Sequence, residues 1–221
     1  MGKYNDHRRL EGKHAYLGCS QSSWENRDDE QLVQMYYSKF ASEVGTAVHA
    51  FAQNCIVNKI KLRKTDDHLI DYFLKVEWPS EKYKGSKIPP GAYDSRMLIE
   101  TVSLFVNDAI GFRMDSEVIL AYNEDYAFGT SDAFSCDEAS KTIRVHDLKT
   151  GVHPVKMNQL LLYAAQYCLE YGKNPKDYHF ELRVYQGGEI IEYFPVADEI
   201  IEKMQNIVHA TKVLINKIER I

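Results

Sequence analysis

FGTSD (residues 128–132), followed closely by IRVHDLKTG (residues 143–151), is the stretch that decides the fold of this chain. The segments that contain these motifs, Ala127–Ser135 and Thr142–Lys149, have the residue pattern of β-strands. Residues 136–140 between them are turn formers, as are residues 123–125 ahead of them. Ser116–Tyr122 predicts one more strand before that first turn. The sequence therefore predicts three consecutive strands joined by short turns.

Helical patterns lie on both sides of these strands. Apolar residues at spacings of three and four predict one or two helices between residues 29 and 61, and further helices are expected at 66–76 and 96–110. A loop rich in Pro, Gly and Lys is expected over residues 79–95. After the strands we expect a helix at 155–171 and a hairpin at 177–186 and 189–194. A last helix is expected at 198–219, with a broad apolar stripe.

These elements predict an α/β fold, with a central mixed β-sheet flanked by helices and an N-terminal helical elaboration. A chain of 221 residues fits one compact domain. Within it, residues 1–112 form the mainly helical part that carries His49. Residues 113–221 form a β-β-β-α-β-β-α core, and we expect the helical part to pack over the cleft of the active site.

The composition limits the classes of protein to which the chain can belong. No stretch approaches the ~18 apolar residues of a membrane span, and no apolar segment follows the basic residues at the start, so we expect an intracellular protein without a secretion signal. The net charge of −5 is not typical of a protein that coats nucleic acid through bulk charge, yet it does not exclude a nucleic-acid substrate. Four widely spaced cysteines favour reduced, structural thiols.

The strands carry a pattern of chemical groups. Side chains alternate along a strand, so Asp147 and Lys149 project from the same face, and Asp132 on the preceding strand comes level with them. Two carboxylates and an ammonium in one pocket suit phosphodiester hydrolysis. Carboxylate oxygens hold Mg²⁺ or Mn²⁺, and Lys149 orients the attacking water or neutralises charge on the phosphoryl oxygens.

A second acid-x-Lys tripeptide, Glu11-Gly12-Lys13, shows how weak such a signal is alone. It has glycine at its centre and no strand before it, and we reject it. The tripeptide at Asp147 follows an apolar strand, has an upstream acid, and precedes a break at Gly151 and a predicted helix.

An ordered set of motifs resembles the RecB-like branch of the PD-(D/E)XK nuclease superfamily, which includes phage-encoded proteins and CRISPR-associated RecB-like exonucleases. The motifs are Gly45-x-x-x-His49, Gly129-x-x-Asp132, Asp147-x-Lys149 and Gln159-x-x-x-Tyr163. The resemblance implies a restriction-endonuclease-like core. It also implies His49, Asp132, Asp147 and the Leu148 carbonyl as metal ligands, with Asp132, Asp147, Lys149, Gln159 and Tyr163 in catalytic roles.

The resemblance further implies an Mg²⁺- or Mn²⁺-dependent deoxyribonuclease, exonuclease in preference to endonuclease, that acts in phage or mobile-element DNA recombination. DNA is the expected partner, with a recombinase or single-strand-annealing protein as a further candidate. The expected location is the cytoplasm of a bacterial or phage-infected cell, and no membrane association is expected. The late cysteine cluster of the iron–sulfur relatives is absent, so no cluster is predicted, and no helicase-type phosphate loop occurs.

Structural alternatives stay open for each residue. His49 lies on an apolar helix where a core histidine is common, Asp132 suits a hairpin cap, and Gln159 and Tyr163 suit a helix surface. Asp147 and Lys149 suit an exposed ion pair worth under ~1 kcal/mol. Glu43, six residues before His49, is expected to be solvated. The rival functions are a nuclease-fold module that binds DNA or protein without cutting, and a different metal-dependent hydrolase or an RNA-directed nuclease that uses the same site.

Overall fold

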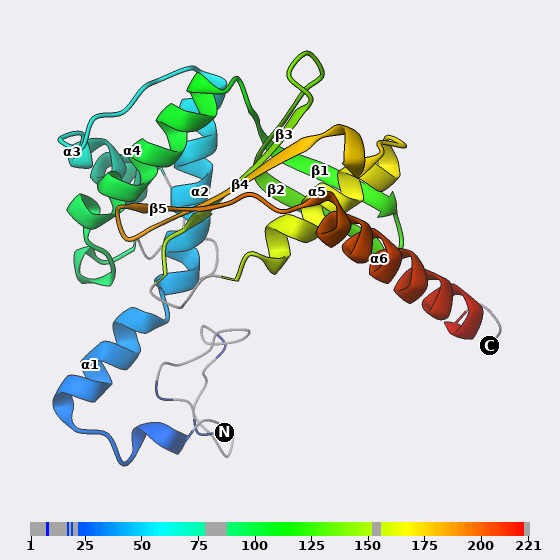
Figure 1. Ribbon diagram of the computed structural model, residues 1–221. Helices are drawn as coiled ribbons and strands as arrows, with labels where there is room; N and C mark the ends of the chain where they lie inside the picture. Colours follow the sequence, from blue (N-terminus) through cyan, green and yellow to red (C-terminus); the bar gives the residue numbers. More distant parts are fainter. Residues whose placement is uncertain are drawn as a thin grey trace.

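A five-stranded sheet with helices on both faces forms the centre of the molecule (Figure 1). The computed structural model describes residues 22–77, 88–151 and 156–218, together with Arg8, Leu17 and Cys19. The strand order is β1-β2-β3-β4-β5. The strands are β1 (Asp115–Asn123), β2 (Ala127–Asp137), β3 (Thr142–Lys149), β4 (His179–Gln186) and β5 (Glu189–Tyr193).

The sheet is mixed. β1, β2 and β3 are antiparallel neighbours, β3 and β4 are parallel, and β4 and β5 form an antiparallel hairpin around Gly187 and Gly188. Both glycines have positive φ (60° and 79°), the backbone that a two-residue hairpin turn requires. A parallel pair needs a crossover connection, and α5 (Asn158–Glu170) supplies it between β3 and β4. The prediction of an α/β fold with a mixed sheet flanked by helices is confirmed.

The remaining helices also follow the predicted order. They are α1 (Asp29–Ser38), α2 (Ala41–Val57), α3 (Asp67–Tyr72), α4 (Ser95–Gly111) and α6 (Ala197–Ile218), and a π-helical turn, Phe73–Glu77, follows α3. The helical region predicted between residues 29 and 61 is two helices. Asp28 caps the first, because its side chain accepts from the backbone of Gln31, whose own side chain bonds back to Asp28. Of the predicted 79–95 loop only residues 88–95 are described, and residues 155 and 219–221 also lie outside the described part.

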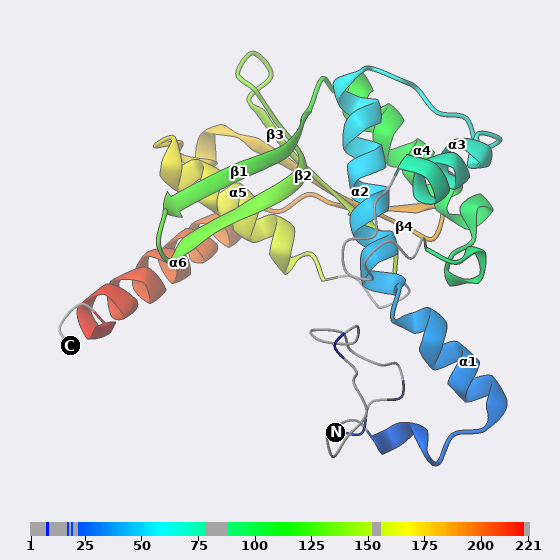
Figure 2. The same ribbon diagram turned by 180° about the vertical axis from the view of Figure 1, so that it is seen from behind.

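Two hydrophobic cores lie on opposite sides of the sheet. One lies beneath α2, α3 and α4 and includes Leu148 and Tyr185 from neighbouring positions of β3 and β4. The other lies beneath α5 and α6 and includes Val145 and Val184 of the same strands. Figure 2 shows α2 and α4 on one side of the sheet, with α5 and α6 at the other end of the molecule. The helices that carry His49 and Gln159 are therefore held against the sheet by separate cores.

Burial along two helices depends on what packs against them. The apolar stripe of α6 buries Ile200 and Ile207 in its first half, but Val213, Leu214 and Ile218 are exposed because the far half of the helix extends beyond the sheet (Figure 1). The prediction that Glu43 is solvated is wrong, because α2 packs that face against its neighbours and buries Glu43. None of the helices in the described ranges is both long and apolar enough to cross a lipid bilayer.

Candidate active site

The candidate site lies where β2 and β3 separate. The hydrogen-bonded ladder between them ends at the pair Ala133 and His146. At the next position, a side chain takes the place of the backbone acceptor, since Asp132 Oδ2 accepts a hydrogen bond from the backbone N–H of Leu148 at 2.7 Å. This bond fixes the Asp132 carboxylate beside β3 and brings it to the level of Asp147, as the sequence predicted.

His49 lies on helix α2, which packs against one face of the sheet. His49 Nδ1 lies 3.3 Å from Asp132 Oδ1, the oxygen that the Leu148 bond leaves available. One turn earlier on the helix, a Cβ added to Gly45 would lie 3.2 Å from Thr150 Oγ1, just past the end of β3. A small residue at Gly45 therefore lets α2 approach the end of β3 closely, which accounts for the Gly-x-x-x-His spacing.

Lys149 links the sheet to helix α5. Its Nζ donates to Asp147 Oδ1 at 3.0 Å and lies 2.9 Å from Asp147 Oδ2. The same Nζ donates to Gln159 Oε1 at 3.2 Å, and Gln159 Nε2 donates to the Tyr163 hydroxyl at 3.0 Å. A Cβ added to Gly129 would lie 2.9 Å from the Tyr163 ring, so the Tyr163 side chain needs a glycine in β2.

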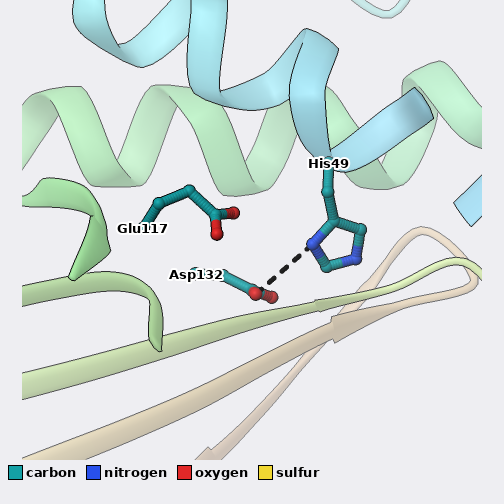
Figure 3. Close-up of side chains that lie close together, drawn as sticks. All are labelled: His49, Glu117 and Asp132. Carbon is teal, nitrogen blue, oxygen red and sulfur yellow. Dashed lines mark ion pairs between the residues drawn. The ribbon is translucent and has the colours of Figure 1, made fainter. Parts of the chain in front are cut away.

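Glu117 of β1 joins the site although no sequence motif indicated it. Its carboxylate, the His49 imidazole and the Asp132 carboxylate each offer a ligand atom, and these atoms all lie within 4.8 Å of one another. Figure 3 shows the three side chains converging from α2, β1 and β2. Their combination of one nitrogen and carboxylate oxygens suits a divalent cation such as Mn²⁺. Asp147 is not a member of this group, although it lies at the adjacent position of the fork.

β1 and β2 change faces near Glu117 and Asp132. Leu120 belongs to the core beneath α5, and its partner Gly129 faces Tyr163 of that helix. Ala133 belongs instead to the core beneath α2 and α4. In a regular strand, residues an even number apart share a face, so β2 turns over between Gly129 and Ala133. The turnover brings Asp132 to the boundary between the faces, within reach of α2 and of β3.

Negative charge dominates the electrostatics of the site. Burial raises the pKa of the Asp147 carboxyl to about 6, and the nearby Asp132 charge adds to the rise, which Lys149 partly offsets. Burial and the Asp132 charge also raise the pKa of Glu117. Burial lowers the pKa of His49, but the hydrogen bond and charge of Asp132 more than compensate, so its pKa lies above the usual value. The carboxylates disfavour one another and favour a positive charge among them.

The residues present fit a divalent cation. Asp147 is 2% exposed, and the Lys149 ammonium, 2.9 Å from its Oδ2, is an ion-pair partner of that oxygen without the geometry of a hydrogen bond. Buried carboxylate oxygens are normally hydrogen-bonded or bound to a metal. Oxygen and imidazole donors converge from α2, β1 and β2, and the Lys149 side chain is 37% exposed. The Leu148 carbonyl, proposed as one more ligand, belongs to the residue whose N–H holds Asp132.

The chain matches no protein-family model, and no curated protein is significantly similar to it in sequence. Its function is therefore inferred from its own residues.

Proposed function

We propose that this protein is a metal-dependent nuclease that hydrolyses the phosphodiester bonds of DNA. One observation carries the proposal: the residues of four separate motifs form a continuous series of contacts. His49 contacts Asp132, Asp132 binds the backbone beside Asp147, Lys149 bonds to Asp147 and Gln159, and Gln159 bonds to Tyr163. A set of unrelated core and surface residues has no reason to meet in one fork of a sheet.

A purely structural role for each residue is less compatible with this geometry. Asp132 lies inside a strand rather than at a hairpin turn, and Asp147 is almost fully buried rather than part of an exposed ion pair. Among the described residues of the site, the carboxylates of Glu117, Asp132 and Asp147 face one ammonium, that of Lys149, and one histidine. A structural network gains stability by balancing its buried charges, so this surplus of negative charge favours a cation site.

Each residue of the candidate site has a role that its position supports. A divalent cation held by His49, Asp132, Asp147 and the Leu148 carbonyl would polarise the phosphate and lower the pKa of a bound water. Lys149 offers its ammonium to the negative charge that develops on the phosphoryl oxygens. Gln159 holds the Lys149 ammonium in place, and the Tyr163 hydroxyl holds the Gln159 amide.

The order of the elements supports the same proposal. Three antiparallel strands, a crossover helix and a parallel strand follow one another. The resemblance to the RecB-like nucleases implies a restriction-endonuclease-like core, in which we expect this order of elements. We therefore propose that core as the fold. The preference for exonuclease over endonuclease, the use of Mg²⁺ or Mn²⁺, a recombinase or single-strand-annealing partner, and a role in phage or mobile-element recombination in the bacterial cytoplasm follow from the resemblance.

The test is cleavage of end-labelled linear duplex DNA, single-stranded DNA, closed circular duplex DNA and RNA of the same sequence. Each substrate is incubated with Mn²⁺, Mg²⁺ or EDTA. The variants are Lys149→Ala and, as a matched control, Lys212→Ala on the exposed side of α6. We expect shortening of linear DNA from its ends with metal only, no cleavage by Lys149→Ala, and wild-type cleavage by Lys212→Ala.

Other outcomes identify the rivals. Cleavage of closed circles as well would assign an endonuclease, and cleavage of RNA alone would assign the RNA-directed nuclease. If the folded wild-type protein binds DNA but leaves every substrate intact with both metals, the nuclease proposal is wrong and the binding module takes its place.

A further inference from the structure

We infer that Glu117 is a metal ligand, and that it binds the divalent cation of the site together with His49 and Asp132. The inference rests on the proposed function and deepens it, because it adds a residue from β1 to the same site. It adds Glu117 to the ligand set derived from the motifs, in which Asp132 and Asp147 share one cation and Glu117 has no part.

The register of the sheet sets two carboxylates opposite each other. Ser116 pairs with Ala133 and Val118 pairs with Ser131, so Glu117 lies opposite Asp132 in the antiparallel pair of β1 and β2. Side chains at opposite positions of such a pair have Cβ atoms about 4.5–5.5 Å apart, and like charges there are destabilising. A cation between the two carboxylates converts this repulsion into attraction.

The backbone of Glu117 is unusual for a strand. Its φ is 53°, in the left-handed region, and the other non-glycine residues of the described chain with positive φ (Lys59, Arg113 and Lys141) lie in turns. A glutamate gains nothing locally from this conformation, which costs on the order of 1–2 kcal/mol. Strained residues of this kind concentrate at functional sites. Here the strain coincides with the change of faces that turns Glu117 toward His49 and Asp132.

Within the described part of the chain, the cluster lacks a strong cation of its own. The Lys149 ammonium lies within 3.0 Å of both Asp147 oxygens and also bonds to Gln159. In the cluster itself, His49 alone can contribute positive charge, and it does so only when protonated. The raised pKa of Glu117, which burial and the Asp132 charge cause, is consistent with carboxylates held together against their repulsion.

The donors indicate the type of cation. Carboxylate oxygens bind Mg²⁺, Ca²⁺ and Mn²⁺ alike, whereas an imidazole nitrogen favours transition metals, which Mn²⁺ resembles more than Mg²⁺ does. We therefore expect the cluster to bind Mn²⁺ more tightly than Mg²⁺ or Ca²⁺.

The experiment is Mn²⁺ binding to the full chain without DNA at about pH 7.5, measured by titration calorimetry and by the electron paramagnetic resonance signal of free Mn²⁺. The variant is Glu117→Gln, with Glu124→Gln, in the exposed turn after β1, as the matched control. We expect wild type and Glu124→Gln to bind Mn²⁺ with affinities within about threefold of one another. Glu117→Gln should bind at least about tenfold more weakly.

A further variant, Glu117→Gly, guards against a folding defect. Glycine adopts positive φ without strain, so this variant should melt at a higher temperature than wild type in EDTA while it loses Mn²⁺ affinity as Glu117→Gln does. Loss of affinity together with a raised melting temperature cannot come from unfolding.

The inference is wrong if wild type binds no Mn²⁺, or if both Glu117 variants bind it as tightly as wild type. Failure of the proposed function is distinguishable. Mn²⁺ binding that depends on Glu117 in a protein that cuts no DNA supports the cluster and refutes the nuclease, whereas Mn²⁺-dependent cleavage with Glu117-independent binding does the reverse.

Discussion

Two polar networks lie on either side of β3, and the adjacent residues His146 and Asp147 belong to one each. In the His146 network, His146 Nδ1 lies 3.1 Å from the Tyr185 hydroxyl, which donates to Asp108 Oδ2 at 2.8 Å. Arg183 donates to the same Asp108 oxygen at 2.9 Å and forms an ion pair with Glu192. Every charged group in this network has a partner of opposite charge.

The candidate active site has similar parts in a different balance. Each network holds a buried or half-buried histidine near a carboxylate, but arginines surround His146 and carboxylates surround His49. Burial and the charges of Arg183 and Arg144 lower the pKa of His146 to about 3, so it is neutral. The net effect of burial and of the carboxylates raises the pKa of His49.

This difference distinguishes a charge-balanced structural network from the proposed cation site. Buried charges that balance one another hold the fold together, and in the His146 network two buried nitrogen atoms, His146 Nε2 and Arg183 Nε, have no hydrogen-bond partner among the described residues. A surplus of carboxylates beside an exposed lysine leaves a repulsion that a bound cation would remove. The comparison predicts that substitutions in the His146 network affect stability, and that substitutions in the site affect chemistry.

The largest expected effect is that of Asp147→Asn. We expect cleavage to fall on the order of 10³-fold, because the substitution removes a carboxylate that would hold the cation at the reacting phosphate. The metal-free variant should be at least as stable as wild type at about pH 7.5. The carboxyl of Asp147 has a pKa of about 6, so its buried charged form opposes folding above that pH, and wild-type stability recovers as the pH falls from 6 towards 3.8.

Cleavage rates with Mn²⁺ and thermal melting in EDTA measure the two quantities for Asp147→Asn. Marked destabilisation of the metal-free variant near neutral pH would assign the Asp147–Lys149 pair to the structure rather than to the chemistry.

Asp108→Asn is expected to have the opposite profile. It removes the charge that pairs with Arg183 and receives the Tyr185 hydroxyl, so the free energy of unfolding should fall by about 2 kcal/mol. Urea unfolding at room temperature measures this change. Cleavage at the same temperature should stay within about twofold of wild type, because Asp108 contacts none of the described residues of the site. A tenfold change in rate would need a change of about 1.4 kcal/mol in the activation free energy. Loss of cleavage by the folded variant would show that the two networks are coupled.

The two histidines should act oppositely on the pH dependence of stability in EDTA. Because the pKa of His49 is raised, its protonation adds stability that is present below pH 6.5 and lost as the pH rises through the folded-state pKa. Because the pKa of His146 is lowered to about 3, stability is lost as the pH falls from 6.5 towards 3. One such group contributes up to about 1.4 kcal/mol per pH unit.

Between about pH 7 and pH 5, therefore, His146→Gln should lose less stability than wild type and His49→Gln should lose more. Urea unfolding across this range compares them, with His209→Gln on the exposed face of α6 as the control. Parallel profiles for the two variants would remove the electrostatic contrast between the networks.

The smallest expected effect is that of Tyr163→Phe. The Tyr163 hydroxyl accepts a hydrogen bond from Gln159 and touches Lys149 only through it. Loss of one such bond is worth about 1 kcal/mol, so cleavage should fall by less than about tenfold and stability should change by under about 0.5 kcal/mol. Steady-state rates measure the change. A loss as large as that of Asp147→Asn would give Tyr163 a direct role in the chemistry.

Much of the fold could be predicted because its signals are local. The bounds of β3, Thr142–Lys149, agree with the prediction, since turn formers flank a short run of strand residues. Burial was harder to predict, because it depends on distant partners. Glu43 is covered by the packing of α2, whereas the far half of α6 extends past the sheet and leaves Leu214 exposed.

The candidate site divides in the same way. The ordered motifs of the amino-acid sequence predicted one common site, made of His49, Asp132, Asp147, Lys149, Gln159 and Tyr163. Glu117 has no such signal, because a glutamate in a strand next to Val118 is usually a solvated residue. Its position opposite Asp132 depends on the register of β1 and β2 and on a left-handed backbone, and neither can be predicted from the neighbouring residues.

The most direct test compares Asp147→Asn with Asp108→Asn, one from each network, in Mn²⁺-dependent cleavage of end-labelled linear DNA at a temperature where both are folded. We predict that wild type and Asp108→Asn shorten the DNA and that Asp147→Asn leaves it intact. An inert wild type, or equal cleavage by the two variants, would contradict the claim that the fork of β2 and β3 is a nuclease active site.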